Sequence, residues 1–441
     1  ISSVIAALGS LIFANAQEFT MVFIGRFLVG LGGSLVFVPT IKLLTLYYSP
    51  KAFAKVTGIL IAFAGVGSLL STSPLEWMST KYDTFVTRHG ARSTQNPFPT
   101  EPDAWHCDLN YLMMYADGDD PIEQPLYLEF YYDNGYNALP GTCMLGELTC
   151  VGRDMEKARG EWYRNRYVNE LGLLPDTMDP TTLYLRSTDI QRTKESLMAQ
   201  LNGLYPESAR QHRLHVHTGD SGYDDMIPQW SRCPRMHQMY YGGINEEPFY
   251  LDYMATIQPE LDSINAKTGG DMTWVPIYDN LDCRNASAME FPFGITEHEY
   301  LTSIDAANFE MYAQFTNQTE YLQLYIGMFV QEISDMLVDA AAGNLEYTFA
   351  MHSGHDSTIS PLMGVLQDWD YTWPPYASVI AFELYSDDRG EQYIKSRYLD
   401  RDLRPPFCNG LVYCPLDMFV AGLAEFAVPG VNSYLERCVA L

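Results

Sequence analysis

The sequence predicts an α/β fold that follows an apolar, helical N-terminal segment, and three observations lead to this. The composition changes abruptly near Trp77, from almost entirely apolar to mixed. After that point, short apolar runs typical of buried strands alternate with longer stretches of helical spacing. The chain has 441 residues, of which 47% are hydrophobic and 13% aromatic, enough for a large core in two or three domains.

The predicted elements alternate along most of the chain after Trp77. Strands are expected at residues 82–87, 183–186, 347–351 and 378–385, and helices at residues 148–171, 189–204 and 321–341. From about residue 225 to 319 the chain is rich in aromatic residues, irregular and long enough for an insertion. We therefore expect an α/β core made of residues 78–224 and 320–441, with residues 225–319 as an inserted, mostly helical cap.

The first 77 residues have the pattern of transmembrane helices. Met21–Leu46 and Phe53–Leu75 are each long and apolar enough to cross a bilayer, and Ile1–Ala16 has the character of the end of an earlier span. Gly-Arg-Phe-Leu-Val-Gly-Leu-Gly-Gly (25–33) and the residues up to Trp77 resemble the major facilitator superfamily. That family has twelve helices and this segment at most three, so transport is not expected. A real fusion that anchors the protein in a membrane and a gene model that joined two neighbours both stay open.

The charge of the chain is very uneven. Residues 1–80 hold four basic and two acidic residues, and the remainder holds 23 basic and 53 acidic residues, a net charge of −30. Such a surface repels nucleic acid and anionic lipid, so neither is expected as a partner of the soluble part. An anionic substrate would need a local basic site that works against the overall field.

The eight cysteines lie beyond residue 100, with no Cys-x-x-Cys pair and no zinc spacing. An even, dispersed set favours disulfides in an oxidising compartment. Two glycosylation sequons, at Asn285 and Asn317, fit the same location.

The strongest chemical motif is Thr-Arg-His-Gly-Ala-Arg-Ser (87–93), directly after the first predicted strand. A neutral imidazole such as that of His89 can attack phosphorus and form a phosphohistidine. The guanidinium groups of Arg88 and Arg92 match phosphoryl oxygens bidentately and stay charged at any working pH. The glycine lets the backbone turn after the strand.

Two further segments follow predicted strands. Leu-Arg-Ser-Thr-Asp-Ile (185–190) places Arg186 at a strand end and a cap on the next helix, where α/β folds bind anions. Ala-Met-His-Ser-Gly-His-Asp (350–356) offers His355 as another cation and Asp356 as a carboxylic acid for the leaving group. Taken singly, Arg186 as a cap partner and Asp356 as an N-cap are equally good interpretations.

Together the three segments resemble the histidine acid phosphatases, the larger branch of the histidine phosphatase superfamily, over residues 82–438. The resemblance implies acid phosphatase activity on a small phosphorylated substrate, with His89 as the nucleophile and Asp356 as the proton donor. It assigns phosphate binding to Arg88, Arg92, Arg186 and His355, and it implies no metal and no cofactor. It also implies disulfides Cys408–Cys414 and Cys233–Cys438, and it leaves the pairing of Cys107, Cys143, Cys150 and Cys283 open.

The chain departs from this family in three places. Thr94 stands where the family usually has proline, and His352 where relatives often have an aromatic residue. Val379 stands where some animal relatives carry a cysteine, so Cys283 lacks that partner.

Several alternatives remain at the level of the sequence. A narrower phosphatase of the same fold, acting on phytate, a sugar phosphate or a glycan-linked phosphate, is the main rival. A transport fragment with an inactive phosphatase-like tail is disfavoured by helix number and by the intact motif residues. Lys42, Lys51 and Lys55 flank one short loop, which predicts that this loop is cytoplasmic and the chain after Trp77 extracellular or luminal.

Overall fold

The computed structural model describes residues 79–107, 110–113, 126–129, 137–210 and 214–439, together with Leu8, Ile12 and Leu28. The chain divides into two compact units, Ile1–Met78 and Ser79–Leu441. The predicted transmembrane helices, their orientation and the likeness to a transporter lie outside the described residues. Among the residues described, no helix is both long and apolar enough to cross a membrane.

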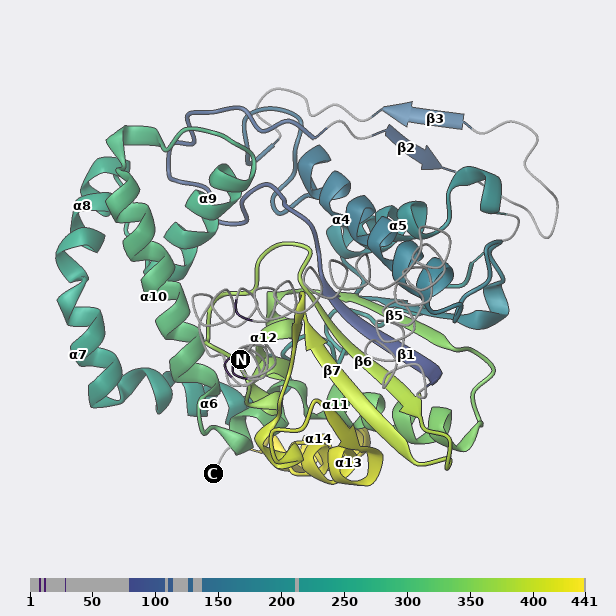
Figure 1. The fold of residues 1–441 in the computed structure, drawn as a ribbon. Helices are drawn as coiled ribbons and strands as arrows, with labels where there is room; N and C mark the ends of the chain where they lie inside the picture. Colours follow the sequence, from purple (N-terminus) through teal and green to yellow (C-terminus); the bar gives the residue numbers. More distant parts are fainter. Residues whose placement is uncertain are drawn as a thin grey trace, which may run out of the picture. The chain divides into compact units, whose positions relative to one another are not determined.

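A mixed β-sheet forms the centre of the second unit (Figure 1). Its strand order is β4-β5-β1-β6-β7-β8, and β9 pairs with β7. The strands are β1 (Ser79–Arg88), β4 (Leu183–Ser187), β5 (Phe349–Gly354), β6 (Val379–Ser386), β7 (Gln392–Tyr398), β8 (Arg401–Asp402) and β9 (Tyr413–Pro415). β5 lies parallel to both β1 and β4, whereas β6 is antiparallel to β1. The carboxyl ends of β1, β4 and β5 therefore meet at one edge of the sheet, where open α/β sheets bind ligands.

Helices cover both faces of this sheet. The flanking helices are α4 (Cys150–Tyr163, continued by a π-helical turn, Arg164–Glu170), α5 (Gln191–Leu204), α11 (Thr319–Ala342), α12 (Asp356–Leu366), α13 (Leu416–Ala424) and α14 (Gly430–Arg437). Successive β1 residues point to opposite faces: Phe85 packs into the core under α4 and α5, and Val86 into the core under α11 and α12. Both are fully buried, so β1 is a central strand with two covered faces.

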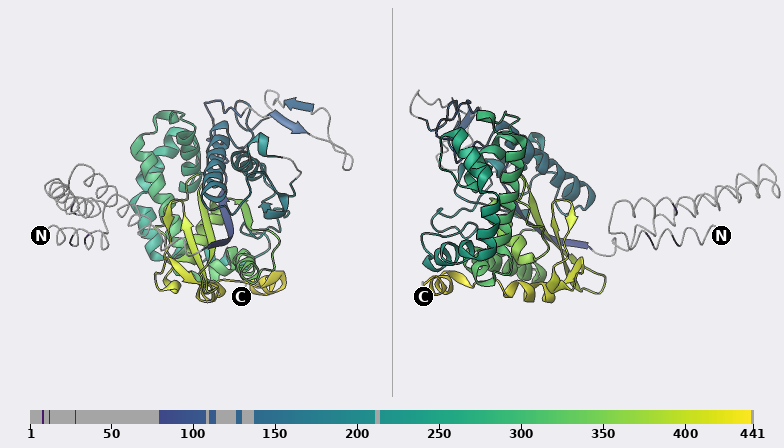
Figure 2. Two further views of the ribbon diagram at one scale, coloured as in Figure 1. Left: turned by 45° about the vertical axis from the view of Figure 1, so that its right-hand side comes forward. Right: turned by 90° about the vertical axis from the view of Figure 1, so that its left-hand side faces the viewer.

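Five helices lie within residues 225–319, the region in which a mostly helical cap is expected. They are α6 (Pro234–Tyr241), α7 (Pro248–Thr256), α8 (Gln258–Thr268), α9 (Trp274–Ala286) and α10 (Glu297–Phe315). Figures 1 and 2 show α7 to α10 grouped to one side of the sheet. Their own core includes Ile264, Ile277 and Tyr300, and α10 begins with a capping box between Thr296 and Glu299. A short antiparallel pair, β2 (Asn110–Met113) and β3 (Leu126–Glu129), completes the elements.

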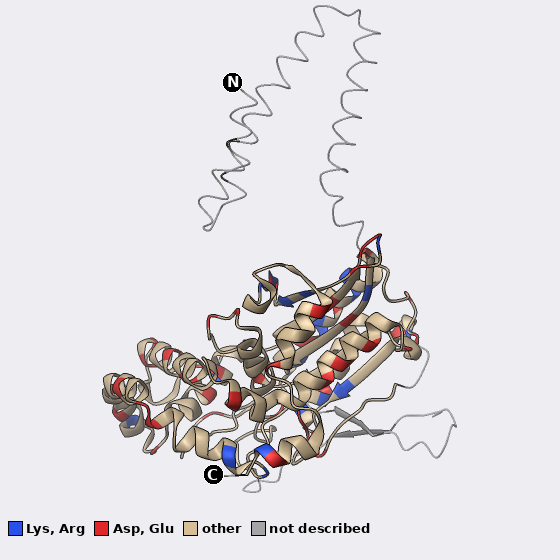
Figure 3. Ribbon diagram, turned by 90° about the horizontal axis from the view of Figure 1, so that it is seen from below, with Lys and Arg blue, Asp and Glu red and all other residues tan. Residues whose placement is uncertain are grey.

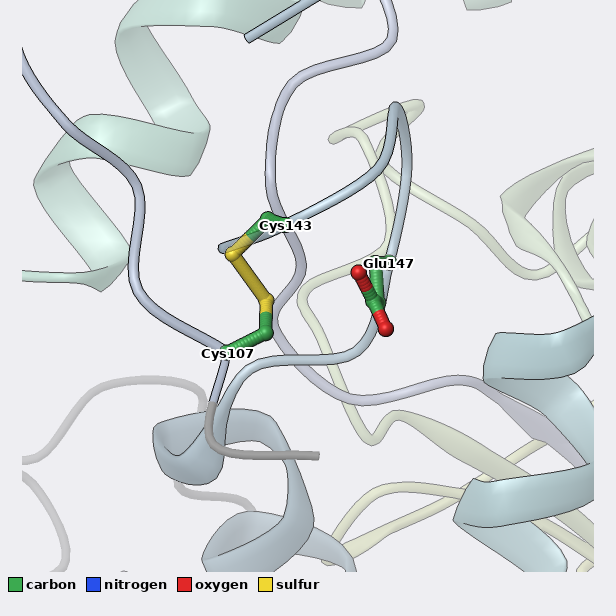
Figure 4. Close-up of side chains that lie close together, drawn as sticks. All are labelled: Cys107, Cys143 and Glu147. Atoms are coloured by element: carbon green, nitrogen blue, oxygen red, sulfur yellow. A yellow bond between two sulfur atoms is a disulfide. The ribbon is translucent and has the colours of Figure 1, made fainter. Parts of the chain in front are cut away.

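Three disulfides connect the chain. Cys408–Cys414 and Cys233–Cys438 agree with the expected pairs, and the third joins Cys107 to Cys143. The carboxylate of Glu147 lies close to the Cys107–Cys143 bond (Figure 4). Sulfur atoms joined in a disulfide are not thiolates, so this group does not form a metal site.

The acidic character of the chain is distributed over the second unit. Figure 3 shows Asp and Glu spread along the helices, with fewer Lys and Arg among them. The chain carries a formal net charge of −28. An anion-binding site in this unit therefore has to collect its own cations.

Candidate active site

The segment after β1 reaches the edge of the sheet between β5 and β6. The Arg88 amide donates to the carbonyl of Ser378 at 2.9 Å, and the His89 amide donates to the carbonyl of Gly354 at 3.0 Å. Both side chains are buried. The neighbouring strands thus hold the backbone on either side of His89, and its ring position follows from the sheet.

The imidazole of His89 has one nitrogen fixed by a hydrogen bond. Its Nδ1 lies 2.8 Å from the carbonyl oxygen of Gly90, an acceptor, so Nδ1 carries the proton and Nε2 keeps its lone pair. Burial first, and then the charges of Arg192 and Arg88, hold the pKa of His89 well below its ordinary value. Both effects favour the neutral ring of His89, whose Nε2 lone pair is then free.

The glycine after His89 has a different purpose from the expected one. Gly90 does not have a positive φ angle. A Cβ atom at Gly90 would lie 2.3 Å from the carbonyl oxygen of Gly152, and one at Gly152 would lie 2.0 Å from the carbonyl oxygen of Ala91. The two glycines let the amino end of α4 pack directly against the motif backbone, which fixes the segment that carries His89.

Arg88 is turned toward Asp356. Its Nη2 lies 2.9 Å from Oδ2 of Asp356, its Nη1 donates to the carbonyl of Pro374, and its guanidinium lies over the ring of Tyr376, 4.1 Å from the centroid. Burial would lower the pKa of Arg88, but the charge of Asp356, together with Tyr376 and further acidic groups, raises it. Arg88 is therefore a fixed cation next to both His89 and the expected proton donor.

Arg92 is held by helix α9. Its Nη2 donates to Oδ1 of Asp279 at 2.6 Å, and its Nη1 donates to Sγ of Cys283 at 3.4 Å. Asp279 Oδ2 also accepts from the hydroxyl of Thr94 at 2.9 Å. Thr94, in place of the family's proline, thus connects the motif to α9.

His355 and Arg192 face each other at the end of β5. Thr188 Oγ1 lies 2.9 Å from Nε2 of His355, and Arg192 Nη2 lies 3.3 Å from Nδ1. Because Arg192 has only protons to give, Nδ1 accepts and Nε2 carries the proton. Burial first, and then Arg192, hold the pKa of His355 well below its ordinary value. The rings of His89 and His355 are 5.4 Å apart between centroids, so the two imidazoles share one pocket.

Asp356 lies at the first position of α12, and its side chain is 19% exposed. The indole Nε1 of Trp373 donates to Oδ2 at 3.1 Å, and the amide of Ser357 donates to Oδ1 at 2.8 Å. Burial would raise the pKa of Asp356, but Arg88 and Arg92 lower it to about 2. Without a bound phosphate, Asp356 is therefore the ionised partner of Arg88.

Arg186 requires a correction, because the structure does not bring it into this pocket. Its guanidinium donates to the carboxylates of Asp224, Asp225 and Glu332. Burial would lower the pKa of Arg186, but Asp225 and Glu332 raise it. The reason is the strand register: Arg186 lies within β4 beside His352 of β5, and its side chain points to the face that α11 covers.

Arg192 takes the place in the pocket that was expected for Arg186. It is the second residue of α5, in the first turn of the helix after β4, and it is buried. Burial first, and then Arg92, lower its pKa to about 10, so it stays charged. Anions bind in α/β folds where a strand end meets the start of the next helix, and this rule could have identified Arg192 from the sequence. Arg192 lies in the first turn of α5, whereas Arg186 lies before the end of β4.

The surroundings of His352 and Cys283 explain the other two departures from the family. His352 is fully buried, its Nδ1 lies 3.2 Å from the carbonyl of Phe85, and it contacts the ring of Phe329 on α11. It lies on the opposite face of β5 from the pocket and does not perturb it. The sulfur of Cys283 contacts Arg92 and the hydroxyl of Tyr376, and burial raises the pKa of its thiol to about 12.

The pocket at this sheet edge thus brings together the imidazole of His89, three arginines, a second histidine and a carboxylate. Comparison with known proteins agrees with this arrangement. The chain belongs to the histidine phosphatase superfamily, branch 2, whose family model matches residues 84–398. The protein is thereby placed among the acid phosphatases of this superfamily, which are phosphoric monoester hydrolases.

Three curated relatives illustrate the sequence similarity. Counting factor 60 of Dictyostelium discoideum is 24% identical over 80% of this chain and 86% of its own length. Human lysophosphatidic acid phosphatase type 6 is 25% identical over 78% of this chain and 82% of its own length. Human prostatic acid phosphatase is 26% identical over 77% of this chain and 83% of its own length.

A solved structure with a similar fold is Hafnia alvei phytase in complex with tartrate. The TM-score is 0.58, with 16% sequence identity, and the match covers 80% of this chain and 98% of the phytase. At this identity the likeness concerns the fold alone.

Proposed function

We propose that this protein hydrolyses phosphate monoesters through a phosphohistidine on His89, with Asp356 as the proton donor. The observation that carries the proposal is the neutral His89 ring with Nδ1 fixed on Gly90, beside Arg88, Arg92, Arg192 and His355. A phosphoryl group that approaches Nε2 meets three guanidinium cations beside the neutral ring of His355, and these cations stabilise the charge of the transition state.

The reaction proceeds in two displacements. Nε2 of His89 forms a bond to phosphorus while the bond from phosphorus to the ester oxygen breaks, and Asp356 gives its proton to that oxygen. Asp356, now a carboxylate, takes a proton from water, and the resulting hydroxide attacks phosphorus and releases His89. The ester and one water molecule thus give the alcohol and inorganic phosphate, and His89 and Asp356 return to their starting states.

The proton on Asp356 must arrive with the substrate. Asp356 alone is ionised because of Arg88 and Arg92. A bound phosphate competes for the same arginines, and a phosphate monoester whose second pKa is about 6 carries a proton below that pH. This supports an acid phosphatase, since above about pH 6 that proton is lost from the complex.

The protein also works in an oxidising compartment under this proposal. Three disulfides among the described residues support it, because such bonds persist in secreted and luminal proteins. The expected sequons Asn285 and Asn317 are both exposed. We retain residues 225–319 as the cap, and an attachment to a membrane through residues 1–77 stays a prediction.

The first prediction concerns His89. We expect His89→Ala to retain less than about a thousandth of the wild-type turnover of p-nitrophenyl phosphate, because both ring nitrogens of His355, the other imidazole of the pocket, are engaged by Thr188 and Arg192. Steady-state kinetics with the purified protein measure this, and His215→Ala, at an exposed histidine, serves as the control. Substantial activity in His89→Ala would show that the covalent mechanism is wrong.

A further inference from the structure

A cavity of about 610 Å³ opens directly beside the proton donor. Asp356, Ser357 and Trp373 line its end at the active site, and residues of α6 to α10 line most of the remainder. Its volume is within the range of small-molecule sites, about 300–1,000 Å³. Because Asp356 protonates the ester oxygen, the group attached to that oxygen points into this cavity when the phosphate is bound against His89.

The walls of the cavity are mostly aromatic and aliphatic. Trp230, Phe315 and Tyr325 contribute from the core side, and Met254, Trp274 and Val275 from α7 and α9. None of the lining residues that the structure describes is Lys, Arg or His. A leaving group that carries further phosphates would therefore find no cation here, and would lose its hydration without compensation.

The cavity also contains a fixed acidic residue. Glu310 of α10 is 3% exposed. Its Oε1 accepts from the hydroxyl of Tyr240 and from Nε2 of Gln314, the latter at 3.0 Å, and its Oε2 accepts from the hydroxyl of Tyr250 at 2.7 Å. These donors hold the carboxyl group in place, so its oxygens form a fixed acceptor surface that offers no donor to a second phosphate.

We propose that this cavity holds the leaving group of the substrate, that the preferred substrate is the phosphate monoester of an alcohol with an uncharged, extended alkyl or aryl body, and that Glu310 excludes leaving groups with a second phosphate. The inference rests on the proposed phosphatase function. It distinguishes this chain from an enzyme for phytate, whose leaving group carries several phosphates.

A series of alkyl phosphates tests the apolar part of the proposal without any variant. Ethyl, butyl, hexyl and octyl phosphate differ only in the length of chain that the cavity would bury. We expect kcat/KM of the wild-type protein to rise about two- to fourfold per added methylene until the cavity is filled. A flat series would overturn the proposal, provided that p-nitrophenyl phosphate is hydrolysed. Loss of hydrolysis of all these esters would instead overturn the proposed function.

A pair of substrates and a pair of variants test the role of Glu310. Hexyl phosphate and hexane-1,6-diyl bisphosphate have the same chain, but the second places a dianion in the cavity. We expect the wild-type protein to prefer the monophosphate on the order of 100-fold in kcat/KM. In Glu310→Gln, which is isosteric, that preference should fall about tenfold, and Glu297→Gln, an exposed acid on the same helix, should leave it unchanged.

Two results would contradict this part. Equal use of the two substrates by the wild-type protein would show that the leaving group does not enter the cavity. An unchanged preference in a folded Glu310→Gln variant, as judged by circular dichroism, would show that Glu310 is not the discriminating group. If that variant does not fold, the wild-type comparison still decides the proposal.

Discussion

At the scale of single residues, the pocket depends on how each charge is balanced before the substrate arrives. Arg88 is paired with Asp356 and Arg92 with Asp279, at 2.9 and 2.6 Å. Arg192, by contrast, contacts the neutral ring of His355 and the carbonyl of Gly146. Burial first, and then like-charge repulsion from Arg92, lower the pKa of Arg192. A bound dianion therefore relieves more unfavourable energy at Arg192 than at the two paired arginines.

Arg192 lies in the pocket and Arg186 lies outside it, so substitutions of these two arginines should have separable effects. Arg192→Gln should lower kcat/KM about 100-fold, because it removes charge-assisted hydrogen bonds to the phosphoryl group. Arg186→Gln should leave kcat/KM within about threefold. It should lower the free energy of unfolding by about 1–3 kcal/mol, because the three carboxylates that Arg186 contacts then repel each other. The partial exposure of Asp225 and Glu332 reduces this repulsion.

Steady-state kinetics and urea denaturation of both variants measure the two quantities. If Arg186→Gln were the inactive variant and Arg192→Gln the active one, the assignment made from the strand register would be reversed.

Asp356 gives the second prediction at this scale. Its proton is needed only when the departing alkoxide is basic, so Asp356→Asn should slow an alkyl phosphate far more, by about 100-fold or more, than p-nitrophenyl phosphate. The ratio of the two kcat values in wild type and variant measures this. Equal losses with both esters would assign the proton to another group.

At the scale of elements, the burial of each strand determines whether its position can be predicted from the sequence. β1 and β5 are buried on both faces, and short apolar stretches in each (residues 85–86 and 349–351) allow their positions to be predicted. β7, which pairs with β6, β8 and β9, alternates buried and half-buried residues, with the half-buried Lys395 and Arg397 among them, and it gives no such stretch. The α6–α10 region was expected to be mostly helical but no single helix within it was predicted.

The pocket residues divide in the same way. The motifs predict the pocket residues that lie at a strand end or shortly after it, namely Arg88, His89, Arg92, His355 and Asp356. The place of Arg192 depends on the first turn of α5, and the pairing of Arg92 with Asp279 joins segments far apart in sequence. The disulfide Cys107–Cys143 likewise depends on loops without periodicity, so its pairing could not be derived.

The close approach of α4 to the motif backbone leads to a prediction for Gly152. Gly152→Ala places a Cβ 2.0 Å from the carbonyl oxygen of Ala91, so the segment carrying His89 and Arg92 has to move. We expect kcat/KM to fall roughly 10- to 100-fold, since a displacement of about 1 Å is sufficient for such a loss.

Val151→Ala, an exposed position one residue earlier on α4, is the matched control and should keep wild-type kinetics. Wild-type kinetics in Gly152→Ala would show that the loop adapts without cost, and that the glycine pair does not position the site.

At the scale of the whole molecule, the central sheet contains a buried carboxylate pair that connects stability to pH. Asp83 of β1 and Glu383 of β6 are paired in register, and both are fully buried. Glu383 accepts from Arg166 at 2.7 Å and from the hydroxyls of Tyr167 and Tyr385, both at 2.9 Å. Neither oxygen of Asp83 has a hydrogen-bond partner among the described residues. Burial first, and then the charge of Glu383, hold the pKa of Asp83 well above its ordinary value.

The sign of the pH dependence follows from that direction. A carboxyl group whose pKa is higher in the folded than in the unfolded protein binds its proton more tightly when folded, so folding is favoured at low pH. This contribution is complete below the unfolded pKa of about 3.9 and is lost as the pH rises through the folded pKa. The contribution of Asp83 to folding is thus largest under the acidic conditions that the proposed reaction requires.

The last prediction uses Asp83→Asn, which imitates the protonated carboxyl at every pH. At pH 7.5 the variant should be more stable than the wild-type protein by about 1–3 kcal/mol, because the wild-type carboxyl must then either keep a proton that the unfolded chain has lost or bury a charge. Near pH 4 the two proteins should differ little. Thermal unfolding of both proteins across this range measures the difference, and Asp387→Asn, an acid near the end of β6 outside the core, should show no such trend. A difference that is independent of pH, or that grows toward pH 4, would mean that Asp83 is ionised in the folded protein.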